Sequence, residues 1–177
     1  MSSIRSIALS IFCFLLAGGV ACAGPAEGRA EAVLVSAAGE KIGTAAFKEV
    51  PGGVRVVLKV SKLPPGSHAF HIHSVGKCDP PDFKSAGPHF NPTHKKHGRE
   101  NPEGQHAGDL PNLPVGQDGT GELSVLVPGI TLSGTAENAL FHPGGTAVVI
   151  HASPDDNKTD PAGNAGDRIA CGIVTQF

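Results

Sequence analysis

The sequence predicts an all-β protein, an antiparallel sandwich or flattened barrel, and three observations carry that prediction. Apolar and polar residues alternate along short runs such as 54–60 (VRVVLKV) and 123–127 (LSVLV), as they do in half-buried strands. The 24 glycines and 15 prolines interrupt the chain at short intervals. No window shows a sustained helical period. Short strands joined by turns, in one domain, are therefore expected.

The strands expected in chain order are 32–35, 42–47, 54–60, 123–127, 147–151 and 169–174. Turn signals at 38–39 (AG) and 118–119 (DG) separate some of them. Two further stretches, Asp79–Asn112 and Asp155–Asp167, contain no strand pattern and are predicted to be long loops. Long structureless loops in a compact domain are usually functional or disordered, and polar motifs in these two favour function.

The N-terminus is predicted to be a signal peptide, residues 1–23, followed by a single mature domain, residues 24–177. Arg5 supplies a positive charge, and the apolar run Ile7–Val20 is too short to span a bilayer. The sequence Ala-Cys-Ala at 21–23 offers a cleavage site. Export to the periplasm or another extracytoplasmic compartment follows. Membrane anchoring through a lipidated Cys22 stays open as the alternative.

Two of the four cysteines, Cys13 and Cys22, belong to the signal region, which leaves Cys78 and Cys171 in the mature domain. An even pair in an oxidising compartment favours one disulfide, the alternative being two buried free thiols. The formal charge of −2 and the isoelectric point near 6.5 argue against a nucleic-acid partner.

Histidines concentrate in one stretch: seven of the nine lie between Gly66 and Asp109. His71 and His73 are two residues apart, so on a strand both rings leave the same face. The residues that follow are rich in Gly, Pro and Asn and cannot form a regular element. A bound metal would fix such a loop. Three histidines with one carboxylate are a plausible tetrahedral zinc set.

Six segments occur in a familiar order: GSHAFHIH, SAGPHFNP, KKHG, QHAGDLPN, VVIHASPDD and GNAGDRIACG. Together they resemble the signature segments of copper/zinc superoxide dismutases, and the resemblance runs from about Val33 to Val174. It implies the family's eight-stranded Greek-key barrel and its two metals. The copper ligands that it implies are His71, His73, His89 and His151. The zinc ligands that it implies are His89, His97, His106 and Asp109, with His89 bridging both ions.

The resemblance also implies roles around the metals. Asp155 would link His71 to His97, and His68 would support the copper loop by hydrogen bonds. Arg168 would attract and position the superoxide anion, which is dismuted to dioxygen and hydrogen peroxide by a redox-cycling copper, with His89 storing a proton and zinc structural. His94 and His142 match no ligand position and are expected at the surface.

The rival interpretation is a non-enzymatic metal protein on the same fold. Such a protein would be expected to lack a copper ligand or the arginine, and all are present. One departure concerns the loop before Arg168, which lacks the paired-glutamate and lysine pattern of many eukaryotic members and so puts electrostatic steering in doubt. Oligomeric state stays open, a homodimer included.

Overall fold

The computed structural model describes residues 28–177, so the predicted signal peptide, its cleavage site and Cys22 lie outside the described residues. Within that range the elements are β1 (Arg29–Ser36), β2 (Lys41–Val50), β3 (Gly53–Val60), β4 (Gly66–His68), β5 (Phe70–His73), a 3₁₀ turn η1 (Lys84–Ala86), β6 (Leu113–Val115), β7 (Gly121–Pro128), β8 (Ala147–His151), β9 (Arg168–Ile173) and β10 (Thr175–Gln176). The predicted all-β class is confirmed.

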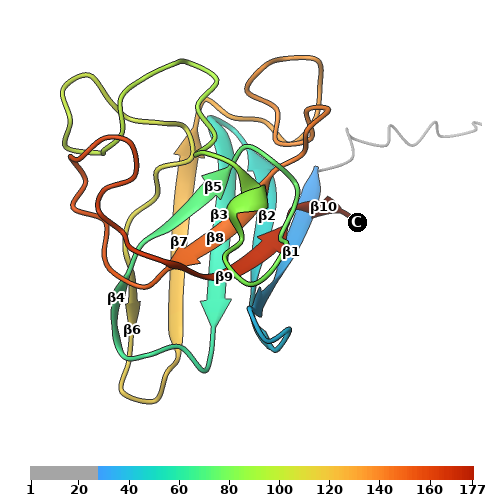
Figure 1. Cartoon of the computed structure of the whole chain (residues 1–177). Coiled ribbons are helices and arrows are strands. Elements are labelled where there is room, and N and C mark those ends of the chain that lie inside the picture. Colours follow the sequence, from blue (N-terminus) through green and yellow to red (C-terminus); the bar gives the residue numbers. More distant parts are fainter. Residues whose placement is uncertain (1–27) are drawn as a thin grey trace, which may run out of the picture.

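Most strands belong to one antiparallel sheet in the order β5-β8-β9-β1-β2-β3-β7, with β10 paired to β1 beside this path. The neighbours β9–β1 and β3–β7 are distant in sequence, which requires the crossing connections of a Greek key. The sheet curls over, so that β5, β8 and β9 lie across β3 and β7 (Figure 1). The short pair β4–β6 lies beside β7.

The space inside the curl is filled by the apolar faces of the strands. Val54, Val56 and Leu58 of β3 are fully buried, while the residues between them are more exposed. Phe70 and Ile72 of β5 belong to the same core cluster. Burial of one such side chain contributes about 1.5–3 kcal/mol. The alternation in the sequence therefore sets which side of each strand faces the core.

All six predicted strands are present. The strands β1, β2, β3 and β7 extend up to three residues beyond the predicted bounds, β8 has those bounds, and β9 begins and ends one residue earlier. Both predicted loops are also confirmed, because 74–112 contains only η1 and 152–167 contains no strand. Three short strands, β4, β6 and β10, were not predicted, nor was the irregular segment 129–146 between β7 and β8. A strand of two or three residues is too short to show alternation. No helix long and apolar enough to cross a membrane occurs within residues 28–177.

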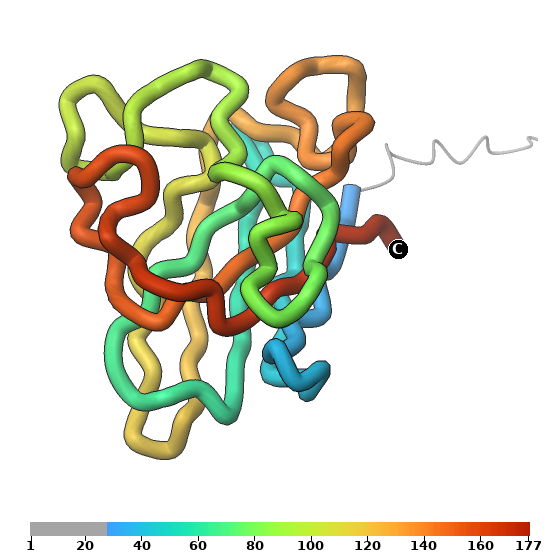
Figure 2. Tube along the Cα trace, viewed as in Figure 1, coloured from blue at the N-terminus to red at the C-terminus, as the bar shows by residue number. Residues whose placement is uncertain are grey.

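The first long loop returns to the free edge of β5 (green to yellow-green in Figure 2). Ile72 donates its N–H to the carbonyl of Gly108 at 3.0 Å and accepts from the N–H of Phe90 at 2.8 Å. A side chain at Gly108 would lie 2.2 Å from the Ile72 carbonyl oxygen, so only glycine permits this approach. The docking carries His89 and Asp109, the chain neighbours of Phe90 and Gly108, alongside β5.

Candidate metal centre

Four buried histidines meet where β5, β8 and the first loop converge, and we call them the four-histidine set: His71, His73, His89 and His151. His71 and His73 leave the same face of β5, as predicted, and His151 ends the neighbouring strand β8. The ring centroids of His71 and His89 are 4.0 Å apart, and those of His71 and His151 are 4.9 Å apart. Each ring offers one nitrogen within 4.8 Å of the others.

A second set, the three-histidine–aspartate set, shares His89 and adds His97, His106 and Asp109. The Oδ1 oxygen of Asp109 lies 2.9, 3.1 and 3.2 Å from the Nδ1 atoms of His89, His97 and His106 respectively. Around a tetrahedral zinc with bonds of about 2.0–2.1 Å, neighbouring ligand atoms would be about 3.3 Å apart. The observed spacing is close to that value, so the set fits a zinc ion.

Four of the ring nitrogens that face into the two sets lack hydrogen-bond partners. Within residues 28–177, five buried side-chain nitrogens have no partner, and four of them are His71 Nδ1, His73 Nε2, His97 Nδ1 and His151 Nε2. In each of these rings the opposite nitrogen is already bonded to a carboxylate or carbonyl oxygen. A buried polar atom left unpaired is costly. This arrangement leaves each free lone pair available to a metal.

Asp155 connects the two sets. His71 Nε2 donates to its Oδ2 at 2.7 Å, and His97 Nε2 donates to its Oδ1 at 3.0 Å. Asn112 fixes the Asp155 backbone, donating to its carbonyl at 2.9 Å and accepting from its N–H at 2.8 Å. The neighbouring Asp156 is exposed and bonds only within its own loop. Of the two aspartates, Asp155 therefore occupies the predicted linking position.

Arg168 is half-buried beside the four-histidine set and is held by the first loop. Its guanidinium donates to the carbonyls of Phe83 at 2.8 Å and Gly87 at 2.9 Å. The predicted disulfide between Cys78 and Cys171 is present, with its Cα atoms 5.6 Å apart, and it ties that loop to β9. The arginine is thus fixed from both sides, by the disulfide-closed segment and by the strand that it begins.

Comparison with known proteins identifies the family to which the chain belongs. A family model described as "Copper/zinc superoxide dismutase (SODC)" matches residues 41–174. The chain belongs to the copper/zinc superoxide dismutase family. Among its relatives, Superoxide dismutase [Cu-Zn] 1 of Aquifex aeolicus is 56% identical over 84% of this chain and 88% of that protein. Superoxide dismutase [Cu-Zn] of Caulobacter vibrioides is 41% identical over 82% of this chain and 84% of that protein.

Among solved structures, that of a SOD-like protein from Bacillus subtilis superposes with a TM-score of 0.78 at 41% identity, covering 81% of this chain and 96% of that one. This superoxide dismutase therefore converts superoxide anion to dioxygen and hydrogen peroxide, with copper and zinc as cofactors. Its disulfide and its bacterial relatives fit an extracytoplasmic compartment.

Burial keeps the four-histidine set neutral in the superoxide dismutase. It lowers the pKa of His71 to about 3 and that of His151 to about 4. Burial also holds the pKa of His73 well below its ordinary value and lowers that of His89. A neutral imidazole has a lone pair to give to a metal, so these shifts favour ligation over protonation.

The surroundings of the Asp109 and Asp155 carboxylates favour the charged form of these groups. Burial alone would raise their pKa values, but hydrogen bonds from His106, His89 and His97 hold the pKa of Asp109 far below its usual range. Asp155 is held low in the same way by His71 and His97. Burial opposes a charge on His97, yet its hydrogen bonds to the two aspartates raise its pKa to about 9. Both carboxylates are therefore ionised at neutral pH.

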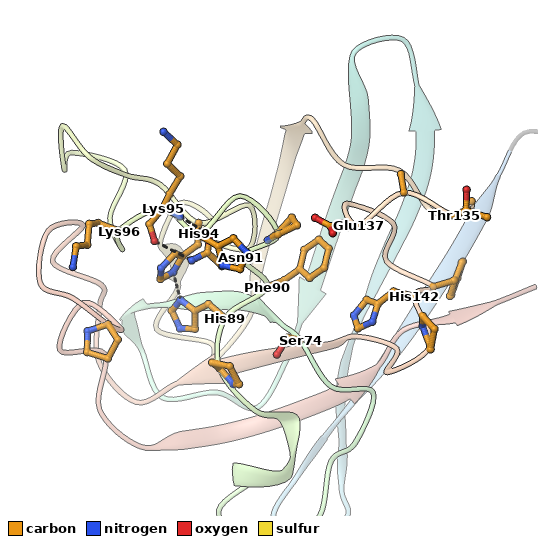
Figure 3. Close-up of a pocket in the computed structure, with 18 of the residues that line it drawn as sticks. Ser74, His89, Phe90, Asn91, His94, Lys95, Lys96, Thr135, Glu137 and His142 are labelled. Carbon is orange, nitrogen blue, oxygen red and sulfur yellow. Dashed lines mark hydrogen bonds between the residues drawn. The ribbon is translucent and has the colours of Figure 1, made fainter.

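Two pockets lie near this region. One, of about 680 Å³, is lined by Arg168 and Lys84 together with Asp82 and Asp167, and by no residue of the metal sets. The other, of about 1200 Å³, is lined by His89 and His106 of the metal sets and partly by Phe90 and Lys96 (Figure 3). The larger pocket does not include Arg168.

Three histidines outside the sets also have defined positions. His68 is buried, and its ring nitrogens lie 2.9 Å from the carbonyls of His151 and Pro64, so it has the kind of hydrogen bonds that the predicted supporting role requires. His94 is exposed, as predicted. The surface position predicted for His142 is wrong: the ring is partly buried and stacks on Phe90, with centroids 5.7 Å apart. Sequence reasoning also gave no role to Asn112, although it lies in the QHAGDLPN segment.

Proposed function

We propose that the four-histidine set binds the copper of this superoxide dismutase and that the three-histidine–aspartate set binds its zinc. The observation that carries the assignment is the set of buried, unpartnered ring nitrogens that face into the two sets. Imidazole suits copper in both oxidation states. Three histidines with a carboxylate, spaced at about the edge of a tetrahedron, suit zinc.

Copper held by these histidines would supply one-electron redox chemistry, taking an electron from one superoxide and giving it to a second. Two superoxide anions and two protons then yield one dioxygen and one hydrogen peroxide. The residues of the chain bind the anion, exclude competing groups and supply a proton. Arg168 is the anion-binding group: its guanidinium is always charged, and it is oriented by Phe83 and Gly87.

His89 is the residue proposed to hold a proton during the reaction. Its Nδ1 lies 2.9 Å from Asp109, within the zinc set, so Nε2 is the nitrogen left for the copper side. That nitrogen would hold a proton and supply it to the peroxide product. The three-histidine–aspartate set, with zinc bound, would keep the His89 ring in place and would take no part in the redox chemistry. Asp155 orients His71 and His97 through their outer nitrogens.

For the location, we infer export by the signal peptide 1–23 to the periplasm, with the mature chain starting at Gly24. The disulfide and the pattern of residues 5–23 support this inference. Lipidation of Cys22 is the competing outcome, and it would tether the same domain to a membrane. The adjacent strands β1 and β9 expose the apolar side chains of Val33 and Ile173, which could be buried in a homodimer interface.

The assignment is tested by the metal content of the purified protein. Wild type should hold one copper and one zinc per chain by elemental mass spectrometry. His73→Ala should lose copper and keep zinc, because His73 belongs only to the four-histidine set; His106→Ala should do the reverse. Loss of the same ion in both variants would contradict the division into two sites.

A further inference from the structure

The two long loops of the protein meet at His97. This residue lies in an irregular part of the first loop, where no strand or helix fixes its backbone. Its ring Nε2 bonds to Asp155 at 3.0 Å, while its Nδ1 lies 3.1 Å from Asp109 Oδ1 and faces into the zinc set. Its carbonyl accepts from Asn101 Nδ2 at 2.9 Å, and its N–H donates to Asp160 Oδ1 at 2.7 Å. Three polar groups of His97 are therefore hydrogen-bonded, two of them by the second loop, and Nδ1 is left for the zinc set.

We propose that Asp160 is a positioning residue for the zinc set, acting through the backbone of His97. The proposal rests on the zinc role proposed above for His97. The side chain of Asp160 contacts the metal sets only through the backbone N–H of His97. It would therefore act on zinc by fixing the backbone position of His97 and not by ligation. The sequence analysis placed Asp160 only within the predicted loop Asp155–Asp167.

The hydrogen bond to Asp160 is suited to that task. A carboxylate accepting a backbone N–H makes a short, charge-assisted bond, roughly twice as strong as a neutral one. At 2.7 Å it is shorter than the 3.0 and 2.9 Å bonds that His97 makes to Asp155 and Asn101. The second oxygen of Asp160 lies 3.3 Å from Lys96 Nζ, an exposed ion pair of little energetic weight. The bond to His97 is thus the main contact of this carboxylate.

Backbone contacts on either side of His97 join the first loop to the second loop, so that His97 and Asp160 are held close together. Glu100 donates its N–H to the carbonyl of Asn157 at 3.0 Å. A side chain at Gly98 would lie 2.3 Å from that same carbonyl oxygen, so the two loops approach as closely as glycine allows. Figure 2 shows the orange-red second loop beside the yellow-green part of the first. The contact between the two loops, which we call the seam, also includes the hydrogen bond from His97 to Asp160, next to the zinc set.

The copper set should depend much less on Asp160. His71, His73 and His151 stand on β5 and β8, whose backbone ladder holds them independently of the seam. A general weakening of the second loop would instead reach His71 through Asp155 and lower both affinities. Selective loss of zinc affinity is therefore the signature of the positioning role.

Four variants separate the contributions. Asp160→Ala removes the acceptor, whereas Asp160→Asn keeps an oxygen that can still accept from His97. Lys96→Met removes only the exposed ion pair. Asp156→Asn is the matched loop control, because Asp156 binds backbone and side chains of its own loop and not His97.

The experiment is competition of each full-length mature variant with a chelator for zinc and for copper, with the visible spectrum of Co²⁺ bound in the zinc set as a probe of geometry. Asp160→Ala should bind zinc about 10–100-fold more weakly, the range for supporting residues of metal ligands, with copper affinity unchanged and an altered cobalt spectrum. Asp160→Asn should recover most of the loss, and both controls should match wild type.

Zinc affinity and a cobalt spectrum equal to wild type in Asp160→Ala would overturn the proposal, and so would equal losses of zinc and copper. Either result would leave the two-metal assignment intact. Wild type that binds no zinc at His97 would remove that assignment and the proposal together.

Discussion

His73 and Arg168 donate hydrogen bonds to one and the same acceptor, the carbonyl oxygen of Gly87, at 2.8 and 2.9 Å. A carbonyl oxygen can accept both, having two lone pairs. Gly87 has a φ of +74°, and a side chain there would lie 2.8 Å from Val75 Cγ2, so glycine is required. One backbone group therefore aligns a ring of the four-histidine set with Arg168, the proposed anion-binding cation.

Arg168→Ala should slow dismutation by an order of magnitude or so, since clefts of one charge sign raise association rates by about 10–10³-fold. The protein as a whole is negative, at −2, so the attraction must be local. Asp167→Ser should leave the rate unchanged or modestly faster. Stopped-flow rates measured against ionic strength check both, and salt should slow wild type more than the alanine variant.

Lys84→Met is the matched control for charge near the same pocket. Lys84 pairs with Asp82 at 2.7 Å and its side chain is 82% exposed, so its loss should matter less than the loss of Arg168. Equal rates and salt slopes in wild type and Arg168→Ala would show that Arg168 does not guide the substrate.

Asp155→Asn should weaken the binding of both metals by about 10–100-fold while the fold is kept. The carboxylate accepts from His71 on one oxygen and from His97 on the other, and an asparagine would turn an N–H₂ group toward one of these donors. Chelator competition measures both affinities. Asp156→Asn, one residue along, should behave as wild type; unchanged affinities in Asp155→Asn would reduce that residue to a loop aspartate.

Metal-free protein should be most stable near neutral pH. The pKa values of His71 and His151 fall from 6.5 unfolded to about 3 and about 4 folded, so below pH 6.5 the unfolded chain binds protons that the folded one refuses, and stability falls. His97 acts oppositely: its folded pKa of about 9 adds stability below pH 6.5 that is lost as pH rises toward 9. Thermal melting of chelator-treated protein between pH 4 and 9 checks this, and a melting temperature that rises steadily toward acid would contradict it.

The mature protein should carry an intact Cys78–Cys171 bridge and begin at Gly24. Mass spectrometry of a non-reduced digest reads both at once. Two alkylatable thiols would disprove the bridge in the exported protein, and a diacylated Cys22 would replace cleavage after Ala23 with a lipid anchor.

The strands and metal sets could be predicted from the sequence because their signals are local. Alternation in 54–60 gives a strand, and the spacing of His71 and His73 gives a shared face. The ordered segments then placed His89, His97 and His106 together by resemblance, which spacing alone could not have done, because they lie on irregular backbone. The distances among these atoms are set by the docking of the loop onto β5, through Ile72 and Gly108.

Other features could not be predicted, for physical reasons. Asp160 contacts His97 across 63 residues of sequence, and nothing in its neighbourhood distinguishes it from a solvated loop aspartate. His142 is partly buried because the ring of Phe90, from the first loop, stacks on it. Strands such as β4 and β6 pair only with each other and are too short for a periodic pattern.

The most direct test of the whole account is superoxide dismutation before and after selective copper removal, in wild type, His73→Ala and His151→Ala. Activity should vanish when copper is removed, return when copper is restored to wild type, and be absent from both variants although they retain most of their zinc. Full activity in either variant, or in protein freed of both metals, would contradict the proposed copper site.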